Sequence, residues 1–307
     1  MARRRKGRDV DGILLLDKPV GRTSNSALQH VRRLFNARKA GHTGSLDPLA
    51  SGLLPICFGE ATKISSWLLH ADKRYLVTAR SGHETDTGDA EGQPTRYSET
   101  GVPPESQLRE MLQDLVGAQQ QVPPMYSALK KDGRPLYELA RAGREVTREA
   151  RSITVHAMHL LTRADDHLTL SVHVSRGTYI RTLVEDLARS WDGAAHVTML
   201  RRTGVGTHDD AGMVDTAMLE AAAEHGPEAL DAYLAPVSTA LAHWRCVHLD
   251  AAQAAAVTNG QAVSADPADA QPGLVRIMDA VDGFLGIGEI SCDGQLQPRR
   301  MFTRALR

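Results

Sequence analysis

The chain has 307 residues, of which 42% are hydrophobic and 24% are charged, and its formal net charge is −1. This length can bury a full-sized core, and the composition excludes a disordered chain. No apolar run reaches the ~20 residues of a membrane-spanning helix. The basic N-terminus precedes only a short apolar run, Ile13–Leu16, so secretion is not expected either.

The cysteines and histidines suggest neither a disulfide framework nor a metal centre. The three cysteines are odd in number and far apart, which fits the reducing cytoplasm: Cys57, Cys246 and Cys292. The histidines considered as ligands do not fall at metal-ligand spacing: His42, His70 and His83. No metal site is therefore predicted.

Charge is unevenly distributed along the chain. Residues 1–40 hold eleven Lys and Arg against three Asp, whereas residues 209–290 hold thirteen Asp and Glu against two Arg. With a Debye length of ~8 Å, a basic RNA-binding face is compatible with near-neutrality overall. The alternative, that both clusters are only solvated faces, stands equally on charge alone.

The first predicted elements are a strand and a helix. Residues 12–16 read as a short buried strand, and residues 17–21 as the turn that ends it. Thr23 or Ser24 can cap the helix that follows, whose apolar residues recur with a 3.6-residue period. The other face of this helix is basic and includes Arg33.

A glycine-punctuated stretch, residues 41–59, comes next. Its four Gly and two Pro exclude one long helix or an uninterrupted central strand, yet it carries too much apolar area for a solvated linker. Asp47 precedes Pro48, which biases it towards an extended or turn conformation. Taken alone, Asp47 is a turn former that caps backbone N–H groups.

Three segments follow this stretch. Thr62 is expected to cap a helix, and a strand is expected from Tyr75, with alternate residues on opposite faces. Residues 83–92 read as a polar, acidic loop, and residues 104–116 as an amphipathic helix.

The middle of the chain is rich in basic residues interleaved with tyrosines. Tyr126 and Tyr137 lie among Lys130, Lys131 and Arg134, a combination that suits exposed phosphates and bases of RNA.

The remaining segments are predicted as follows. Residues 152–163 and 167–175 are expected to form two strands, residues 176–183 a glycine turn opening a helix, and residues 196–206 another strand. From about residue 247 the pattern changes to short strands.

Several of these segments resemble a known family. Residues 41–55, G-H-T-G-S-L-D-P-L-A-S-G-L-L-P, closely resemble the catalytic-loop motif of the TruB family of tRNA pseudouridine synthases. Five further segments also match that family: the D-K-P turn at Lys18, K-R-Y at Tyr75, T-D-T-G-D from residue 85, P-P-M-Y-S-A-L-K ending at Lys130 and T-Y-I-R ending at Arg181. Ser45 stands where an alanine is common, a small-for-small change.

The resemblance implies roles for individual residues. Asp47 is then the catalytic carboxylate, Tyr75 stacks on the target base and can relay a proton, and Arg181 holds Asp47 ionised by lowering its pKa. The substrate-binding residues implied are His42, which would fill the space of a flipped base, Tyr179 and Leu200, which would line the pocket, and Lys18, for which a structural role is expected before direct substrate contact. Lower-ranked RNA contacts are expected from Arg33, Lys130, Lys131, Arg134 and Arg202.

The implied activity is isomerisation of uridine 55, in the T-arm loop of tRNA, to pseudouridine. The implied partner is the tRNA T-arm stem-loop, and the enzyme is expected to be a cytoplasmic monomer without membrane association. No cofactor is expected, since the reaction needs none and neither a P-loop nor a dinucleotide fingerprint is present.

The implied fold is α+β: a mixed, mainly antiparallel central sheet with flanking helices over residues 1–245, and a small β-rich PUA-like RNA-binding domain over residues 246–307. One alternative is a non-catalytic RNA-binding or tRNA-folding protein on the same scaffold, although Asp47, Tyr75 and Arg181 are all present. A weaker alternative is a synthase that acts with a guide-RNA complex, which long basic tails would favour and this chain lacks.

Overall fold

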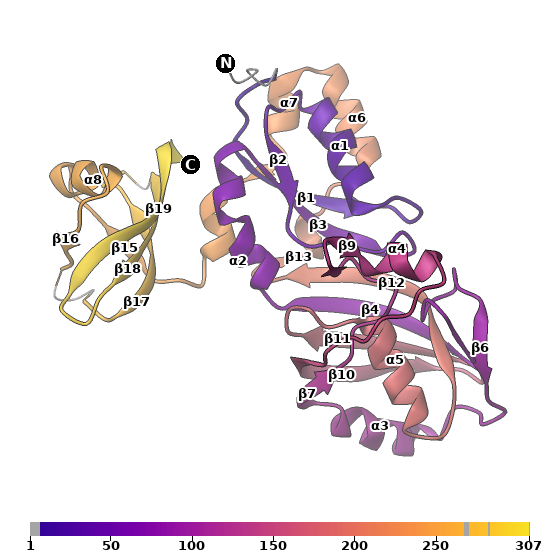
Figure 1. The fold of residues 1–307 in the computed structure, drawn as a ribbon. Helices are drawn as coiled ribbons and strands as arrows, with labels where there is room; N and C mark the ends of the chain where they lie inside the picture. Colours follow the sequence, from indigo (N-terminus) through magenta and orange to yellow (C-terminus); the bar gives the residue numbers. More distant parts are fainter. Residues whose placement is uncertain (1–6, 267–269, 282, 307) are drawn as a thin grey trace.

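A mixed sheet of ten strands forms the centre of the larger part of the molecule (Figure 1). The computed structural model describes residues 7–266, 270–281 and 283–306, so residues 3–6 of the basic N-terminus lie outside it. Along the sheet the strands follow the order β14-β1-β3-β12-β4-β11-β10-β7, with β2 beside β3 and β13 beside β12. Their bounds are β1 Gly12–Lys18, β2 Ala40–His42, β3 Ser51–Phe58, β4 Lys73–Ser81, β7 Gly117–Gln121, β10 Arg151–Arg163, β11 His167–Val174, β12 Ala195–Val205, β13 His208–Asp209 and β14 Leu234–Ala235.

The sheet is mainly antiparallel, as the family resemblance implies. The exception among its pairs is β12 with β3, which run parallel and pair Arg201 with Ser51 and Arg202 with Gly52. On its other side β12 pairs antiparallel with β4, where Arg202 lies opposite Tyr75. The start of β3, which follows the Asp47 loop, and the strand carrying Tyr75 therefore flank β12 at the level of Arg202.

Helices cover the sheet in two groups (Figure 1). The α-helices are α1 Ser24–Leu34, α2 Ser65–His70, α3 Glu105–Asp114, α4 Leu136–Arg141, α5 Ile180–Arg189, α6 Thr216–Glu224 and α7 Pro227–Asp231. The 3₁₀ turns are η1 Gly59–Ile64, η2 Asp210–Gly212 and η3 Val237–Leu241, and two small hairpins pair β5 His83–Thr85 with β6 Pro94–Tyr97 and β8 Lys130–Lys131 with β9 Arg134–Pro135. Helices α1, α6 and α7 gather at the β1 end of the sheet, whereas α5 and α3 lie at the β10 end.

Local sequence signals explain most of these elements. Helix α1 buries Ala27, Leu28 and Val31 on one face, and the Thr23 hydroxyl accepts a hydrogen bond from the Ser26 N–H, which confirms Thr23 as the cap. The helix expected after Thr62 is present as α2, but Thr62 does not cap it: residues 59–64 form η1, inside which the Thr62 hydroxyl donates to the Gly59 carbonyl at 2.7 Å, and α2 begins at Ser65. The expected loop at residues 83–92 also contains strand β5.

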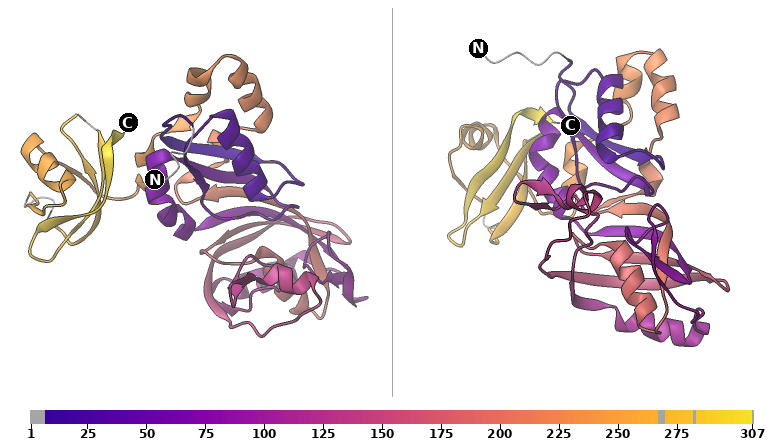
Figure 2. Two further views of the ribbon diagram at one scale, coloured as in Figure 1. Left: turned by 45° about the horizontal axis from the view of Figure 1, so that its top comes forward. Right: turned by 45° about the vertical axis from the view of Figure 1, so that its right-hand side comes forward.

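A second, five-stranded sheet forms the C-terminal part, drawn in orange to yellow in Figure 2. Its order is β15-β17-β18-β19-β16, with bounds β15 Cys246–His248, β16 Val263–Ser264, β17 Gly273–Met278, β18 Phe284–Ile290 and β19 Gln295–Leu306. Helix α8, Ala251–Thr258, was not expected from the sequence, because its Ala-rich run shows no amphipathic period. Its Asp250 cap and Gln253 form a capping box.

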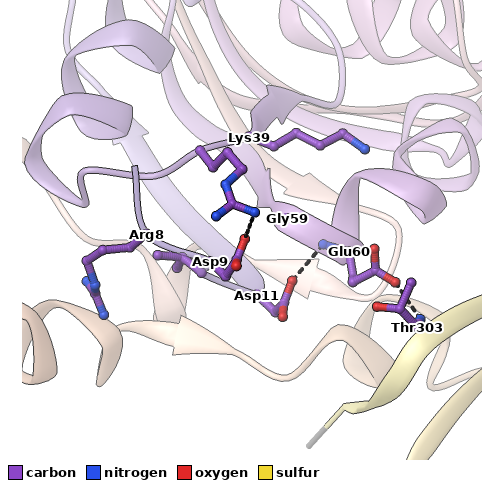
Figure 3. A pocket seen from close by; sticks show the side chains of 9 residues that line it. Arg8, Asp9, Asp11, Lys39, Gly59, Glu60 and Thr303 are labelled. Atoms are coloured by element: carbon purple, nitrogen blue, oxygen red, sulfur yellow. Dashed lines mark hydrogen bonds and ion pairs between the residues drawn. The ribbon is translucent and has the colours of Figure 1, made fainter. Parts of the chain in front are cut away.

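The two parts share an apolar cluster and a set of polar contacts. Ile13 and Leu53 of the large sheet are buried in one cluster with Phe284 and Phe302 of the small one. The Thr303 N–H donates to the Glu60 carboxylate at 2.7 Å, beside a hollow of about 370 Å³ whose lining is shown in Figure 3. Asp47 does not line this hollow.

Candidate active site

The Asp47 loop is held by hydrogen bonds to the beginning of helix α1. The Leu46 N–H donates to the Ser24 hydroxyl at 2.7 Å, and that hydroxyl donates to the Leu46 carbonyl at 3.1 Å. The Gly21 N–H donates to the Pro48 carbonyl at 2.8 Å, just beyond Asp47. Leu46 itself is buried, so apolar packing and hydrogen bonds together fix the backbone around Asp47.

Arg202 binds the backbone on both sides of Asp47 through its side chain. Its side chain is 1% exposed, and its guanidinium donates to the Leu53 carbonyl at 2.6 Å and to the Gly44 carbonyl at 3.2 Å. Gly52 makes this arrangement possible, because a Cβ atom there would lie 2.3 Å from the Arg202 carbonyl oxygen. The expectation that Arg202 contacts RNA conflicts with this burial, and its contacts are those of a residue that positions the loop.

Arg181 contacts the Asp47 loop from helix α5. Its Nη2 lies 3.0 Å from Asp47 Oδ2 and also donates to the Tyr126 carbonyl at 2.8 Å. Its Nη1 donates to the Thr87 carbonyl at 2.6 Å and lies 3.4 Å from Asp89 Oδ2. Arg181 is only 5% exposed, so these contacts fix the guanidinium in one place before any substrate arrives.

The net electrostatic effect on Asp47 differs from the sequence-based expectation. Burial of the surrounding loop raises the pKa of Asp47; Arg181 opposes the rise, Asp89 adds to it, and Lys18 opposes it. Arg181 thus acts on the pKa of Asp47 in the expected direction, but burial raises this pKa by more, so the net shift is upwards. The carboxylate still has access to solvent, since 42% of the Asp47 side chain is exposed.

Asp89 is a site residue to which no role was assigned from the sequence. It is 3% exposed, its carboxylate accepts from the Thr87 hydroxyl at 2.7 Å and from the Glu91 N–H at 3.1 Å, and it lies against Arg181. The available signal was the T-D-T-G-D pattern, residues 85–89, in which Asp89 is the last residue. Asp89 thus holds the far side of the guanidinium that faces Asp47.

Tyr75 and Leu200 lie on neighbouring strands. Tyr75 of β4 is half-buried, packs against the main apolar cluster and lies opposite Val172 of β11. Leu200 of β12 is buried and lies opposite Val77, two residues beyond Tyr75. Because residues two apart on a strand share a face, Tyr75 and Val77 point to the same side of the sheet.

Tyr179 is positioned at the N-terminus of helix α5, two residues before Arg181. The Gln121 side chain receives the Tyr179 N–H at 2.8 Å and donates to the Tyr179 carbonyl at 3.1 Å, which fixes the start of the helix. Burial raises the pKa of the Tyr179 phenol, and both Asp47 and Arg181 act on it electrostatically. Tyr179 therefore belongs to the same local environment as the ion pair.

His42 and Lys18 also face the loop region. Burial lowers the pKa of His42, with Arg202 adding to the effect, so the imidazole is neutral at pH 7 and suited to stacking. Lys18 is fully buried and its ammonium donates to the Pro19 carbonyl at 2.8 Å and the Arg22 carbonyl at 2.7 Å. Burial lowers the pKa of Lys18 to about 8, and its contacts agree with a structural role.

The other basic residues expected to contact RNA lie on the surface. Arg33 is exposed on helix α1, and Lys130, Lys131 and Arg134 are exposed on the β8–β9 hairpin. The Tyr126 carbonyl that receives Arg181 lies four residues before this hairpin. The hairpin is therefore connected by a short segment to the ion pair.

Comparisons with known proteins agree on one family. The N-terminal model of the TruB family pseudouridylate synthases matches residues 32–180, a tRNA pseudouridylate synthase B C-terminal model matches residues 181–242, and a pseudouridine synthase II TruB C-terminal model matches residues 246–302. A tRNA pseudouridine synthase B of Nitrosococcus oceani is 48% identical over 97% of both chains. One of Ectopseudomonas mendocina is 52% identical over 96% of both.

Solved structures share the fold. A Cbf5–Nop10–Gar1 complex contains a chain that is 25% identical, with a TM-score of 0.73 over 96% of this chain and 84% of that one. The H/ACA RNP bound to a substrate RNA containing 2'-deoxyuridine contains another, at 21% identity and a TM-score of 0.72, over 99% of this chain and 92% of that one. Among the described residues, no helix is long and apolar enough to cross a membrane. With close relatives matched over nearly its whole length, the chain belongs to the TruB family of pseudouridine synthases.

Proposed function

We propose that the protein isomerises uridine 55 of the tRNA T-arm loop to pseudouridine. The observation that carries this proposal is the contact of 3.0 Å between Arg181 Nη2 and the solvent-accessible Asp47 carboxylate. Relatives at about half identity over nearly the whole chain are named tRNA pseudouridine synthase B, which supports tRNA as the substrate.

The reaction breaks the C1′–N1 bond and forms a C1′–C5 bond, and the hydrogen on C5 is released to solvent while N1 gains one. Asp47 is the group suited to begin it, because a carboxylate can act as a nucleophile in glycosyl chemistry. Three routes use this carboxylate: attack on the ribose, attack on the base, or removal of a ribose proton to give a glycal. In each of them Arg181 keeps the carboxylate ionised and oriented.

The other site residues bind the flipped nucleotide. The target uridine must leave its stack, which costs a few kcal/mol, and neutral His42 would fill the vacated space. Tyr75 would stack on the uracil, and Tyr179 and Leu200 would line the pocket beside the ion pair. The exposed Arg33, Lys130, Lys131 and Arg134 would contact phosphates, whereas Arg202 and Lys18 would hold the loop.

Two further assignments complete the proposal. We divide the chain into a catalytic domain, residues 1–245, and a PUA-like RNA-binding domain, residues 246–307, since the second sheet begins at Cys246. We also propose that the enzyme is a monomer in the cytoplasm, where the free thiols of Cys57, Cys246 and Cys292 would stay reduced.

A non-catalytic RNA-folding protein is the main alternative, and the intact Asp47–Arg181 pair argues against it, because binding alone does not need a buried arginine aimed at a carboxylate. The decisive experiment measures tritium release from C5-labelled uridine in a T-arm stem-loop with the wild type and with Asp47→Asn. We expect release by the wild type alone. Release by both proteins, or by neither although both bind the RNA, would overturn the proposal.

A further inference from the structure

A second group of chemistry-bearing side chains lies outside the active site. Asp72, His156 and His173 bring one ligand atom each to within 4.8 Å of one another. The His156 Nε2 lies 3.2 Å from Asp72 Oδ2, and the rings of His156 and His173 lie 4.7 Å apart between centroids. We propose that these three residues bind a divalent transition metal ion of the Zn²⁺ class.

The donor set fits this class of ion. Imidazole nitrogen and carboxylate oxygen are ligands that Zn²⁺ takes at about 2.0–2.2 Å, and a tetrahedral ion at that distance separates its ligands by about 3.3 Å. The 3.2 Å between His156 Nε2 and Asp72 Oδ2 is already this separation. The ligand atom of half-buried His173 lies within 4.8 Å of the other two, so it has to move closer to them when an ion binds. Three protein ligands leave a fourth position for water, as in open zinc sites.

A β-bulge directs His156 into the group. Val155 pairs with Val174 and Ala157 with His173, so strand β10 advances two residues where β11 advances one. The additional residue is His156, and bulges commonly redirect a side chain in this way. The bulge lies opposite His173 and Val174 of β11. Both imidazoles are therefore brought to the same end of the β10–β11 ladder.

The backbone on the Asp72 side is fixed as well. Asp72 immediately precedes β4, and its carbonyl accepts from the Gly206 N–H at 2.9 Å. The neighbouring cation is Arg74, which donates to the His208 carbonyl at 3.3 Å and packs over Gly204. Its guanidinium is thereby held against strands β12 and β13, although Arg74 itself lies opposite His173 in the β4–β11 pair.

His173 lies on the opposite face of the sheet from Tyr75. Tyr75 pairs with Val172, so these two side chains share a face, and His173 points to the other. Sequence reasoning missed the group because its members come from three separate segments, and because His42, His70 and His83, which it considered, do not belong to it. An ion here would join the beginning of β4 to β10 and β11.

The test uses the untagged, chelator-treated full chain and titrates it with Zn²⁺ by calorimetry and with Co²⁺ by visible absorption. We expect one equivalent to bind, with tetrahedral Co²⁺ bands, and a rise in Tm in Zn²⁺, because the three ligands are brought together only in the folded chain. His156→Ala and His173→Ala should each weaken binding at least ~10-fold and abolish the rise in Tm. Asp72→Asn should also weaken binding, and circular dichroism verifies that each variant is folded.

His167→Ala is the matched control. His167 lies at the other end of β11 and contacts Asp166 through its Nδ1, a pair of the same chemistry without a third ligand in the described residues. The His167→Ala variant should bind Zn²⁺ with the same affinity as the wild type. Three outcomes would overturn the proposal and leave a surface His–Asp ion pair. They are equal binding by wild type, His156→Ala and His173→Ala, a thiolate charge-transfer band that places Co²⁺ on a cysteine, and no binding at all.

Discussion

Arg181 Nη2 lies 3.0 Å from Asp47 Oδ2, although the two residues are far apart in the chain and belong to different elements. The remaining contacts of the guanidinium are with backbone carbonyls and with buried Asp89. Its orientation is therefore determined by the protein, and the guanidinium needs no reorganisation to hold the ionised Asp47 carboxylate in place.

The first prediction concerns the shape of this guanidinium. Arg181→Lys keeps the charge, but a single ammonium cannot reproduce the planar set of donors to Thr87, Tyr126 and Asp47. We expect the single-turnover rate at saturating RNA to fall ~100-fold, because displacement of a catalytic group by about 1 Å has that effect. RNA affinity should stay within about twofold. Tritium release and a fluorescence binding titration measure the two quantities.

Arg80→Ala is the control for this variant. Arg80 lies on the same sheet, exposed and paired with Asp166 at 3.3 Å, away from the site. It should keep the wild-type rate. If Arg181→Lys reacted as fast as Arg80→Ala, the positioning role of Arg181 would be refuted.

The second prediction is a pH dependence. In the proposed reaction Asp47 acts as the carboxylate, and burial raises its pKa from the usual 3.8, so activity should be present above the raised pKa and be lost as the pH falls through it. Because Arg181 opposes the rise, Arg181→Ala should move the acid limb of kcat/KM to higher pH. Single-turnover rates at low enzyme concentration across the acid range measure this limb. An acid limb unchanged or displaced to lower pH would contradict the electrostatic account.

Sequence alone predicted the elements whose pattern is local. Strand β1, helix α1 with its Thr23 cap, and the β10–β11 pair were expected, because alternation, helical period and capping residues are read within a few positions. Helix α8 and turn η1 were missed, since neither has a periodic apolar face, and the capping box of Asp250 and Gln253 was not recognised. The family resemblance, not the pattern, supplied the pairing of Asp47 with Arg181.

Properties that depend on packing between distant segments could not be predicted. Arg201 and Arg202 are neighbours on β12, so they point to opposite faces, and only the parallel contact with β3 decides which one is buried. Arg201 remains accessible and pairs with Asp17 at 2.7 Å, whereas Arg202 is enclosed. The raised pKa of Asp47 likewise depends on how completely the folded loop excludes water.

The third prediction tests the close contact between β3 and β12. Gly52 has φ +96°, and a Cβ there would lie 2.3 Å from the Arg202 carbonyl oxygen and 2.8 Å from its nitrogen. Neither backbone can move without breaking the sheet. Gly52→Ala should therefore lower the free energy of unfolding in urea by at least about 3 kcal/mol, the combined effect of backbone strain and overlap.

Gly226→Ala separates these two effects. Gly226 has φ +98°, close to that of Gly52, but no atom lies within 4 Å of the position that a Cβ would take there. Gly226→Ala should therefore lower the free energy of unfolding only by the backbone-strain contribution, about 1–3 kcal/mol. Equal losses in the two variants would show that the approach of Arg202 to Gly52 does not constrain the loop.

The fourth prediction distinguishes RNA-contacting cations from those with other roles. Lys130 and Arg33 are exposed, and each is expected to neutralise one phosphate of the RNA. Lys130→Ala and Arg33→Ala should each weaken binding and reduce the slope of log Kd against log salt by about 0.7–0.9, while the single-turnover rate at saturating RNA stays unchanged. Arg80→Ala, which lies on the face of β4 opposite to Tyr75, should leave the slope as it is. An unchanged slope for Lys130→Ala would show that the RNA does not contact the β8–β9 hairpin at Lys130. A loss of the single-turnover rate at saturating RNA would show that the residue acts in the reaction and not only in RNA binding.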